Sequence, residues 1–468
     1  MVLQRSRPGW ALALTSVAFF MVVLDSLVVI TALPAIHRDL GAGLSTLEWT
    51  VNAYSLTAAA GIITAAALGD RLGRRRVFAA GLLLFAAASA ACALAPSVAF
   101  LVAARAVQGV GAAMVIPLSL TILTSAFPAE RRGAIVGIMG GLGGLAVAGG
   151  PLVGGAVTQG LDWHWIFWIN VPIGVAAAAL ATWRLTESRG PAARLDLPAV
   201  GLVSAGAAGV VWGLVRGNEA GWTSPETLAA LTLGVLLLAA FVAWEDRVPE
   251  PMLPLGLFRR RAFAAAGATA FLMSASIFSA AFLASQYFQL VLGYSPLGTG
   301  LRFLPWTATP VAVAPLAGML SDRVGRRPVM VLGLLLQGAG LGWIAFVATL
   351  GTSYGQLVVP LVIAGVGISM ALAATPAAAL SAVEPRDIGR ASGATNTLQR
   401  FGGVFGIAVA SAVFAANGHL GSAAGFTAGF RPALTAVACL SVLGAVSALA
   451  VGRARAPEAV PVIHSAAA

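Results

Sequence analysis

Two ionisable side chains interrupt stretches of the sequence that are otherwise apolar. Asp25 lies near the middle of the apolar run 10–36, and Arg105 lies within the run 99–123. A charged side chain at the centre of a bilayer costs about 2.5–3.5 kcal/mol on insertion scales, so such residues mark functional sites by default. Because a membrane arginine needs a partner, and Asp25 is the carboxylate available to it, we predict that the two residues pair. A purely structural ion pair, or an Arg105 side chain that extends to the membrane surface, is the alternative.

Neutral polar residues accompany these charges in several apolar runs. Gln108 follows Arg105 by three residues, and Arg400 follows Asn396 by four, so each pair shares one face of a helix. We expect a set of such residues to line a cavity between helices: Asn52, Tyr54, Gln108, Gln286, Gln289, Asn396 and Arg400. Glu48, just before the apolar run 49–69, is expected to be a solvated charge at the rim.

A charged pattern, Asp-Arg-x-Gly-Arg-Arg, occurs twice, at 70–75 and at 322–327, each time between long apolar runs. Hydrocarbon does not accept such a turn, so each copy must lie in water between two membrane-crossing helices. A simple charged anchor is the alternative, but the repetition indicates an internal duplication, from which many transporters are built. The residues expected to act in gating or structure are Asp70, Arg71, Gly73 and Arg74, with Asp322, Arg323, Gly325 and Arg326 in the second copy.

The composition is that of a polytopic membrane protein. Charged residues make up 10% of the chain and apolar residues 59%, and there are 55 Gly and 24 Pro. Such glycine and proline contents are usual in membrane helices, where small residues let backbones approach closely. The net charge of +11 comes from arginines that fall mainly in alternate loops and in the tails. By the positive-inside rule, this distribution predicts two cytoplasmic termini in the cell membrane rather than a nucleic-acid-binding surface.

The residue types that are missing exclude several kinds of chemistry. All 28 basic side chains are arginines, so the chain has no lysine for a phosphate-binding P-loop or for a Schiff base. Cys92 and Cys439 lie in apolar runs and are expected to be packed small residues. The four histidines cluster with neither cysteines nor acids, so no metal and no cofactor is predicted.

Fourteen runs are long enough to cross a bilayer, which takes about 20 apolar residues. A cleaved signal peptide is disfavoured because the first run is too long and no Ala-x-Ala site follows it. The sixth run lies between the aromatic turn 163–174 and residue 188. The others cover residues 10–36, 49–69, 77–95, 99–123, 134–158, 197–215, 226–244, 262–291, 300–320, 329–349, 356–378, 391–415 and 432–451.

The repeat and the spans together predict an all-α integral membrane protein made of two six-helix bundles. A cytoplasmic tail, 1–8, precedes the first bundle at 9–188, and the second bundle at 251–452 precedes a cytoplasmic tail at 453–468. Residues 189–250 are expected to hold two extra membrane helices and their linkers, outside the transport core.

Several of these stretches resemble the major facilitator superfamily, in particular its 14-helix drug:proton antiporter family. The two charged hairpins resemble the superfamily's signature loop. Residues 24–34 and 105–113 resemble the antiporter family's first-helix and fourth-helix motifs. The glycine-rich stretch around Gly150, Pro151 and Gly154 resembles a motif found in exporters of the superfamily rather than in importers. The string at 286–300 is also similar to that family.

This resemblance implies a function. In the antiporter family the aspartate that matches Asp25 binds the proton, so Asp25 and Arg105 are expected to couple transport to protons. A nearby arginine favours the charged carboxylate, whereas burial favours the neutral acid, so a change in their distance would change proton affinity. The expected function is proton-driven efflux of hydrophobic, cationic or neutral drugs by alternating access, with dications carried poorly.

Other readings remain open from the sequence. Within transport, the chain could instead export or import one endogenous metabolite or lipid. A multipass membrane enzyme is disfavoured, because no paired carboxylates occur with histidines or metal-ligand spacing. The expected partners are the lipid bilayer, small hydrophobic substrates and protons, but no nucleic acid. A monomer is expected, with a periplasmic adaptor as the alternative.

Overall fold

The computed structural model describes residues 8–41, 43–190, 196–248, 251, 255–384 and 388–452, and the regular elements within these ranges are helices. In chain order they are α1 (Pro8–Leu40), α2 (Leu44–Leu72), α3 (Arg74–Ala93), α4 (Val98–Ala126), α5 (Ala129–Gly160), α6 (Trp165–Trp168), α7 (Asn170–Arg184), α8 (Leu197–Ala220), α9 (Pro225–Glu245), α10 (Gly256–Arg259), α11 (Arg261–Gln286), the π-helical turn η1 (Tyr287–Val291), α12 (Pro296–Thr307), α13 (Thr309–Val324), α14 (Arg326–Val347), α15 (Tyr354–Ser381), α16 (Ile388–Asn417) and α17 (Ala423–Leu449).

Local sequence explains where many of these helices begin and end. Serine side chains cap the free amide groups at several starts: Ser97 accepts from the backbone of Phe100, and Ser353 forms a capping box with Gln356. At both charged hairpins a single glycine joins two helices. Gly73 (φ 115°) and Gly325 (φ 88°) adopt left-handed backbone conformations, which a residue with a Cβ atom rarely takes.

The helices are those of a multi-pass membrane protein. Eleven are long and apolar enough to cross a bilayer, or up to thirteen if the bent helices α2 and α5 each count as one span, among the residues described. Residues 197–213 of α8 form a shorter apolar helix. The run predicted at 300–320 is interrupted at Ala308, so that α12 and α13 together form one candidate span. The prolines Pro305 and Pro310 flank the break, where a missing amide donor favours it.

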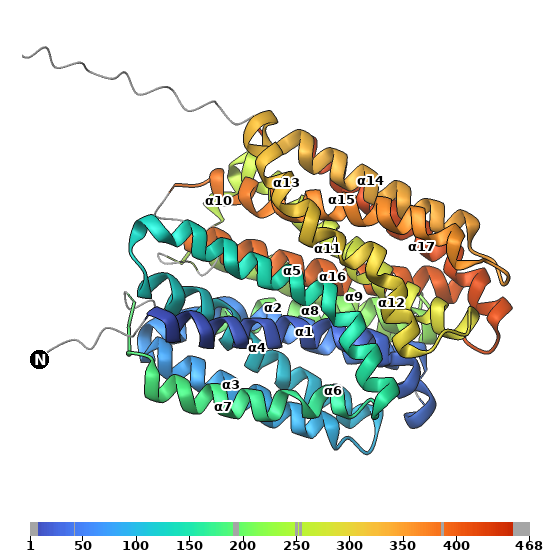
Figure 1. Ribbon diagram of the computed structural model, residues 1–468, viewed down its shortest axis with the longest axis horizontal. Helices are drawn as coiled ribbons and strands as arrows, with labels where there is room; N and C mark the ends of the chain where they lie inside the picture. Colours follow the sequence, from blue (N-terminus) through green and yellow to red (C-terminus); the bar gives the residue numbers. More distant parts are fainter. Residues whose placement is uncertain are drawn as a thin grey trace, which may run out of the picture.

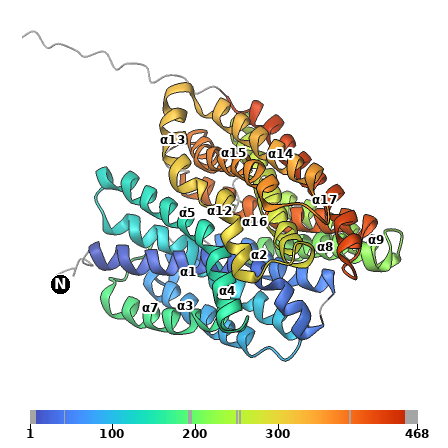
Figure 2. The same ribbon diagram turned by 45° about the vertical axis from the view of Figure 1, so that its right-hand side comes forward.

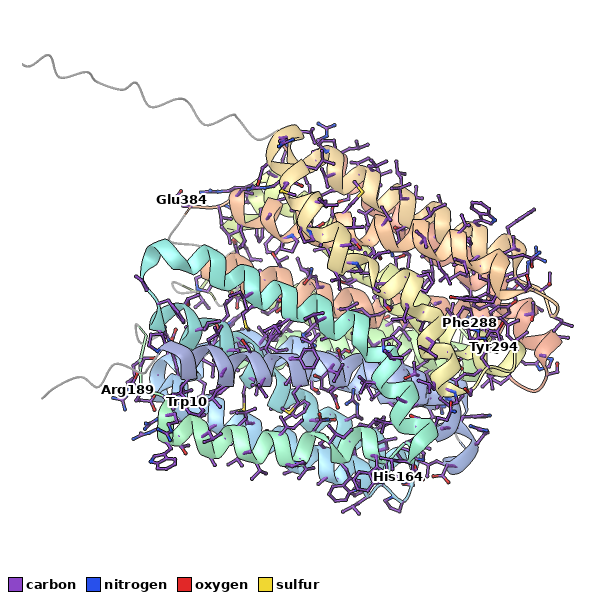
Figure 3. All side chains as sticks on the ribbon, in the orientation of Figure 1. Trp10, His164, Arg189, Phe288, Tyr294 and Glu384 are labelled. Carbon is purple, nitrogen blue, oxygen red and sulfur yellow. The ribbon has the colours of Figure 1, made fainter. Side chains whose placement is uncertain are left out.

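The helices gather in two groups. In Figures 1 and 2, α1 to α7 lie together on one side and α11 to α17 on the other. We call them the N-terminal and the C-terminal group. Figure 3 shows Trp10, Arg189 and Glu384 at one end of the molecule, which we call the hairpin end because both charged hairpins lie there; His164 and Tyr294 lie at the opposite end, the far end.

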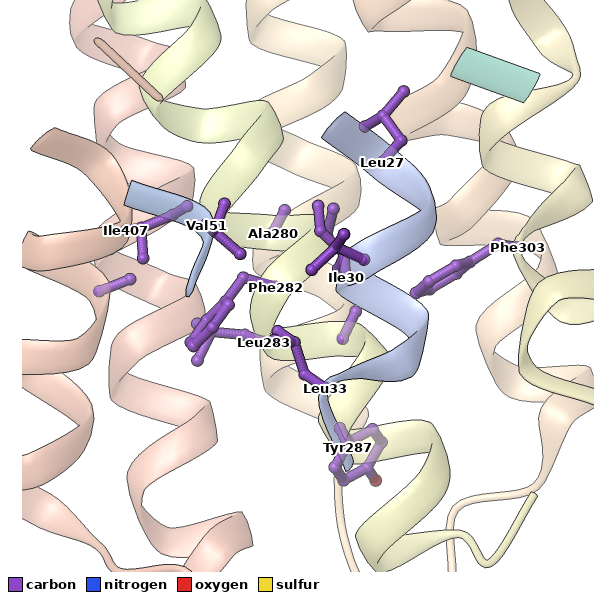
Figure 4. Packing of buried hydrophobic residues seen from close by; sticks show 14 of the residues in the cluster. Leu27, Ile30, Leu33, Val51, Ala280, Phe282, Leu283, Tyr287, Phe303 and Ile407 are labelled. Atoms are coloured by element: carbon purple, nitrogen blue, oxygen red, sulfur yellow. The ribbon is translucent and has the colours of Figure 1, made fainter. Parts of the chain in front are cut away.

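The two groups meet mainly in the half of the molecule towards the far end. Apolar side chains of α1 and α11, such as Ile30 and Leu283, belong to one buried cluster there (Figure 4). The hydroxyl of Ser285 donates to the carbonyl of Ile30 (3.1 Å), and the amide of Gln289 donates to the carbonyl of Thr31 (2.9 Å). The far end is therefore closed by contacts between the two groups.

Glycines allow a second contact between the groups, between α5 and α12. A Cβ atom on Gly155 would meet the backbone of Pro296, and one on Gly300 would meet the backbone of Pro151. The side chain of Gln159 adds a hydrogen bond, because its oxygen accepts from the backbone N–H of Leu297 (3.2 Å). Helix backbones that approach this closely require small residues, as in membrane helix packing generally.

Helix α8, one of the two helices predicted between the bundles, packs against both groups. Ala207 and Val211 of α8 pack in one buried cluster with Leu56 of α2 and with Val404 and Ala408 of α16. The α8 helix thus covers the seam where α2 meets α16.

Candidate functional site

The centre of the N-terminal group contains a buried ion pair between α1 and α4. Nη1 of Arg105 lies 2.6 Å from Oδ2 of Asp25, and the side chains are 0% and 1% exposed. Burial of two charges is costly, and only close geometry with further hydrogen bonds compensates for it. The sequence-based pairing of these residues therefore corresponds to a direct contact, sealed from solvent.

Neutral amides complete the carboxylate's surroundings. Oδ1 of Asp25 accepts from the side-chain amides of Asn170 (2.7 Å) and Gln108 (3.1 Å). Both amides also donate to the hydroxyl of Ser89, at 3.1 Å each, and Ser89 donates to the carbonyl of Phe167 (2.9 Å). Residues of α1, α3, α4 and α7 thus form one hydrogen-bonded unit around a single carboxylate, which we call the carboxylate network.

Arg105 has contacts on its other sides as well. Its Nε donates to the backbone carbonyl of Thr50 (3.0 Å), and its Nη1 also donates to Oε1 of Gln108 (2.7 Å). The guanidinium lies over the ring of Tyr54, 4.2 Å from its centroid, where a cation is attracted by the aromatic face. The arginine is therefore held in place by α2 and α4 as well as by the carboxylate.

Two residues predicted to line a cavity belong instead to this interior. Gln108 and Tyr54 are both fully buried. Gln108 is part of the carboxylate network, and the Tyr54 hydroxyl donates to the carbonyl of Val22 (3.1 Å). Both lie against Arg105: Gln108 accepts from its Nη1, and the Tyr54 ring faces the guanidinium, whose Nη2 has no hydrogen-bond partner among the residues described.

Asn170, Ser89 and Thr50 belong to the site but were not predicted from the sequence. Serine is common in membrane helices, so nothing in the pattern singled out Ser89. Thr50 contributes its backbone carbonyl, which no residue type reveals. Asn170 had a stronger sign, since it is an amide in the apolar part of the aromatic stretch 163–174. That stretch was read as an interfacial turn, but α6 and α7 carry Asn170 into the interior, where it is 5% exposed.

A second arginine, Arg400 of α16, lies where the N-terminal and C-terminal groups meet. Its neighbour one turn earlier, Thr397, donates to the carbonyl of Ala59 on α2 (3.5 Å). Arg400 itself lies near the Tyr54 side chain and is partly exposed. That Arg400 lines a cavity stays a prediction.

Two residues near the start of α2 differ in how they fit their predicted roles. Glu48 is 2% exposed, so the expectation of a solvated rim charge is wrong: α2 begins at Leu44, which places Glu48 one turn inside the helix and against the protein. Asn52 is fully buried, and neither its Oδ1 nor its Nδ2 has a hydrogen-bond partner among the residues described.

The remaining predicted cavity residues lie in different places. Gln286 is buried near the end of α11, where its amide donates to the carbonyl of Phe282 (3.3 Å). Gln289, in η1, is engaged in the contact with Thr31 that closes the far end. Asn396 is exposed and donates to the carbonyl of Ser392 (3.0 Å). Of the three, only Asn396 is open to solvent in this structure.

The first charged hairpin is braced by the chain that follows α7. Nε of Arg74 pairs with Oδ1 of Asp70 at 2.8 Å. The carboxylate of Glu187 accepts from the backbone N–H of Arg75 (3.0 Å), and the N–H of Gly190 donates to the carbonyl of Asp70 (3.2 Å). These contacts fix the hairpin to the end of its own group of helices.

The second hairpin lacks such a brace. Asp322 and Arg323 are exposed, and none of the ion pairs formed by the described residues includes Asp322, Arg323 or Arg326. Arg71 of the first hairpin is likewise exposed. The two copies of one sequence pattern therefore differ in structure.

The predicted glycine-rich motif of α5 packs against α1. A Cβ atom at Gly150 would meet Leu27, and one at Gly154 would meet Val28 and Thr31. Pro151 lies inside α5 between them. This part of α5 thus contacts α1 a few residues beyond Asp25, on the same stretch of α1 that contacts the C-terminal group.

Other features of the described residues lie away from this centre. No group of three or more His, Cys, Asp or Glu side chains within these residues could hold a metal ion. An open groove of about 500 Å³ at the far end, between α14 and α17, is lined by residues that include Phe346 and Arg431, but by none of the predicted site residues.

Comparisons with known proteins agree with this architecture. The sequence profile of the Major Facilitator Superfamily matches residues 15–309 and 266–467. The chain is 35% identical over 417 residues to the tetracenomycin C resistance and export protein of Streptomyces glaucescens, covering 88% of this chain and 77% of that one. It is 36% identical over 404 residues to the multidrug resistance protein Stp of Mycobacterium tuberculosis, covering 86% and 75%. It is 34% identical to the cephamycin export protein CmcT of Amycolatopsis lactamdurans, covering 93% and 91%.

Solved structures show a similar fold at low sequence identity. A POT family transporter crystallised with a thioalcohol-conjugated peptide aligns with a TM-score of 0.70 at 16% identity, covering 94% of this chain and 95% of the other. The peptide transporter POT in complex with sulfate aligns with a TM-score of 0.66 at 17% identity, covering 94% of each chain.

Proposed function

This chain belongs to the major facilitator superfamily, and we propose that it exports hydrophobic drugs or toxic small molecules across the cell membrane in exchange for protons. It is a transporter rather than an enzyme. The observation that carries the proposal is the ion pair of Asp25 and Arg105, which is sealed inside the N-terminal group. An intramembrane carboxylate is retained at such cost where it serves transport.

Protonation of Asp25 would alter the contacts that hold the N-terminal group together. A neutral Asp25 attracts Arg105 less than the carboxylate does. One of its oxygens then carries a hydrogen and becomes a donor, although the groups around it, from Arg105, Gln108 and Asn170, are donors too. Asp25 lies between one and two helical turns from Ile30 and Thr31, which bond to the C-terminal group. A rearrangement of α1 on protonation would therefore act on the contacts that close the far end.

The direction of access follows from the distribution of arginines. The hairpin end is the arginine-rich end, so the positive-inside rule assigns it, together with both termini, to the cytoplasm. The far end, closed by α1, α5, α11 and α12, then faces outward, and the structure represents a state that faces the cytoplasm. Alternating access would proceed by rocking of the two groups around the midplane.

The fourteen-helix count is also part of the proposal. It counts α2 and α5 as single bent spans and adds α8 to the thirteen candidates. The domain limits of 9–188 and 251–452 for the two bundles, with 189–250 between them, stay as predicted. We further propose that the transporter acts as a monomer; dependence on a periplasmic adaptor is the alternative.

The substrate class is supported by the relatives, which are named as resistance or export proteins for antibiotics and drugs. Export or import of one endogenous metabolite or lipid is the second candidate, because nothing in the carboxylate network selects a drug over another hydrophobic compound. A broad susceptibility panel separates the two.

The test is growth of an efflux-deficient host that expresses the wild type, the Asp25→Asn variant or neither, on such a panel. Wild type should raise tolerance to several unrelated hydrophobic compounds, and Asp25→Asn should lose that tolerance while reaching the membrane in equal amount. The matched control is Asp246→Asn, since Asp246 is exposed and forms a surface ion pair with Arg259. Unchanged tolerance in the Asp25→Asn strain would contradict proton-coupled export through this residue.

A further inference from the structure

Of the charged side chains in the middle of the protein, the partly exposed one is an arginine, and the carboxylate is enclosed. Asp25 and Arg105 compensate each other, and their side chains are enclosed. Arg400 is partly exposed at the seam between α2 and α16. Among the described residues near Asp25, the charge that a substrate can contact is therefore the positive charge of Arg400. The Asp25 carboxylate is covered by the amides of Asn170 and Gln108.

The helix contacts on both sides fix the position of Arg400 at the seam. One turn before it, Thr397 bonds to Ala59 of α2, and one turn after it, Val404 packs in the same buried cluster as Leu56 of α2. Within its own group, α16 packs closely against α11, since a Cβ atom at Gly402 would meet the backbone of Phe271. Arg400 thus stands on a rigid helix where both groups meet.

The partner of Arg400 in this structure is neutral. The phenol of Tyr54 lies near the guanidinium and is uncharged, and its hydroxyl donates to the carbonyl of Val22 (3.1 Å). No carboxylate in the described part of the chain forms an ion pair with Arg400. A guanidinium presents five donors in a planar fork, of which one phenol oxygen can satisfy only a part.

We propose that Arg400 is the binding site for an acidic group on the substrate, so that the preferred substrates are hydrophobic molecules with one ionised acid, such as a carboxylate. This inference rests on the proposed export function. A carboxylate matches the guanidinium fork with two parallel, charge-assisted hydrogen bonds and would replace the weaker phenol acceptor. A cationic substrate would meet a like charge in Arg400, with the Asp25 carboxylate out of reach. This reverses the charge preference expected from the sequence, which assumed that Asp25 faces the cavity.

The test compares three ligands that share one ring system. The probes are 1-naphthaleneacetate, its neutral amide 1-naphthaleneacetamide, and the cation 2-(1-naphthyl)ethylammonium. Binding to the full-length protein is measured by calorimetry in phosphatidylcholine nanodiscs, so that no anionic lipid headgroup competes for the arginine. The wild type should bind the acid at least about tenfold more tightly than the amide, which corresponds to one charge-assisted pair, and should bind the cation most weakly. Equal binding of the three, preference for the cation, or no binding of the acid at millimolar concentration contradicts the proposal.

Variants then assign the preference to Arg400. In Arg400→Gln the acid should bind no better than the amide, whereas Arg400→Lys should keep part of the preference. The matched control is Arg431→Gln, because Arg431 is an exposed arginine of the same group of helices at the far end. Acid preference that survives Arg400→Gln overturns the assignment. If that variant does not fold, the wild-type series and Arg400→Lys still decide.

The outcomes also separate this site from the exporter function. Proton-driven export in which Arg400→Gln changes neither the acid nor the neutral amide would contradict the acid site and leave the proposed function standing. Selective acid binding in a protein that shows no proton coupling would support the site and contradict the proposed function.

Discussion

At the scale of single residues, the charged members of the carboxylate network could be predicted from the sequence, whereas its neutral members could not. Asp25 and Arg105 could be found because a charge inside an apolar run is rare and costly. Asn170 and Ser89 could not be weighed in the same way, because neutral polar residues are ordinary in membrane helices and acquire meaning only from what they contact.

We predict that Asn170→Ala slows proton-coupled transport about tenfold. Asn170 donates at 2.7 Å to the buried Asp25 carboxylate, and loss of a hydrogen bond to a charged group costs about 1.5–3 kcal/mol. The measurement is the transport rate as a function of pH in reconstituted vesicles, because a merely structural role would lower the rate without moving its pH dependence. The control is Asn417→Ala, whose amide is exposed and bonds within its own helix. A wild-type pH profile in Asn170→Ala would speak against the network.

The residues placed wrongly share one physical cause. Glu48, Tyr54 and Gln108 were located by their position along a helix, but position does not tell which face meets another helix. Tyr54 and Gln108 face Arg105, and Glu48 lies one turn inside α2. Each was expected to contact water or a cavity and is instead buried. Whether such a side chain is buried depends on how the helices pack, and the packing cannot be read from a single sequence.

At the scale of elements, α5 links the carboxylate region to the far end. Its glycines contact α1 on one side, at Gly150 and Gly154, and α12 on the other, at Gly155. The resemblance to an exporter motif marked this stretch, but not its second partner, because α12 is remote in sequence. The structure therefore adds a role in closing the far end.

We predict that Gly155→Val weakens this closure and lowers transport at least about tenfold, because its side chain would collide with the backbone of Pro296. Gly149→Val is the matched control, since a Cβ atom there meets nothing within 4 Å. Closure is measured by cross-linking cysteines placed at Gln159 and Leu297, with Cys439, which is exposed, replaced by Ala. Equal cross-linking yields in the two glycine variants would show that this contact does not close the far end.

The two charged hairpins should respond unequally to the same substitution. Asp70→Ala removes a pair with Arg74 at the hairpin that Glu187 braces, so we expect slower transport with an unchanged set of substrates. Asp322→Ala should have the smaller effect in this conformation, because Asp322 is exposed. Initial export rates for a panel of compounds check both points. A changed substrate profile in Asp70→Ala with an unchanged rate would count against a gating role.

At the scale of the whole molecule, the fold followed from the sequence further than the site did. Apolar runs and the repeated hairpin predicted helices in two groups, and the family comparison agrees. The sequence did not predict that α8 would contact both groups, or that one span would be divided into α12 and α13 at Ala308. Both depend on contacts and bends that hydropathy does not report.

Membrane potential should act differently on the export of neutral and of anionic substrates. If one proton enters for each molecule exported, a neutral substrate moves one charge inward, and a monoanion leaving the cell moves two. At 100 mV these charges correspond to about 2.3 and 4.6 kcal/mol, or limiting gradients of about 50-fold and 2,000-fold. Accumulation ratios of 1-naphthaleneacetate and of its amide are measured in everted vesicles at a set of clamped potentials. The logarithm of the ratio plotted against potential should have twice the slope for the acid. Equal slopes would contradict export of the ionised acid.

Proton coupling through Asp25 is measured most directly as substrate-dependent proton movement in liposomes that contain the purified wild type or the Asp25→Asn variant. A pH-sensitive dye inside the liposomes reports protons, and a compound identified by the susceptibility panel serves as substrate. Asn keeps the size of the side chain and can still receive a hydrogen bond from Arg105, but it cannot take up a proton. We predict proton flux that depends on substrate in the wild type, and no such flux in Asp25→Asn although it still binds the compound. Wild-type proton flux in Asp25→Asn would show that the proton travels by another route.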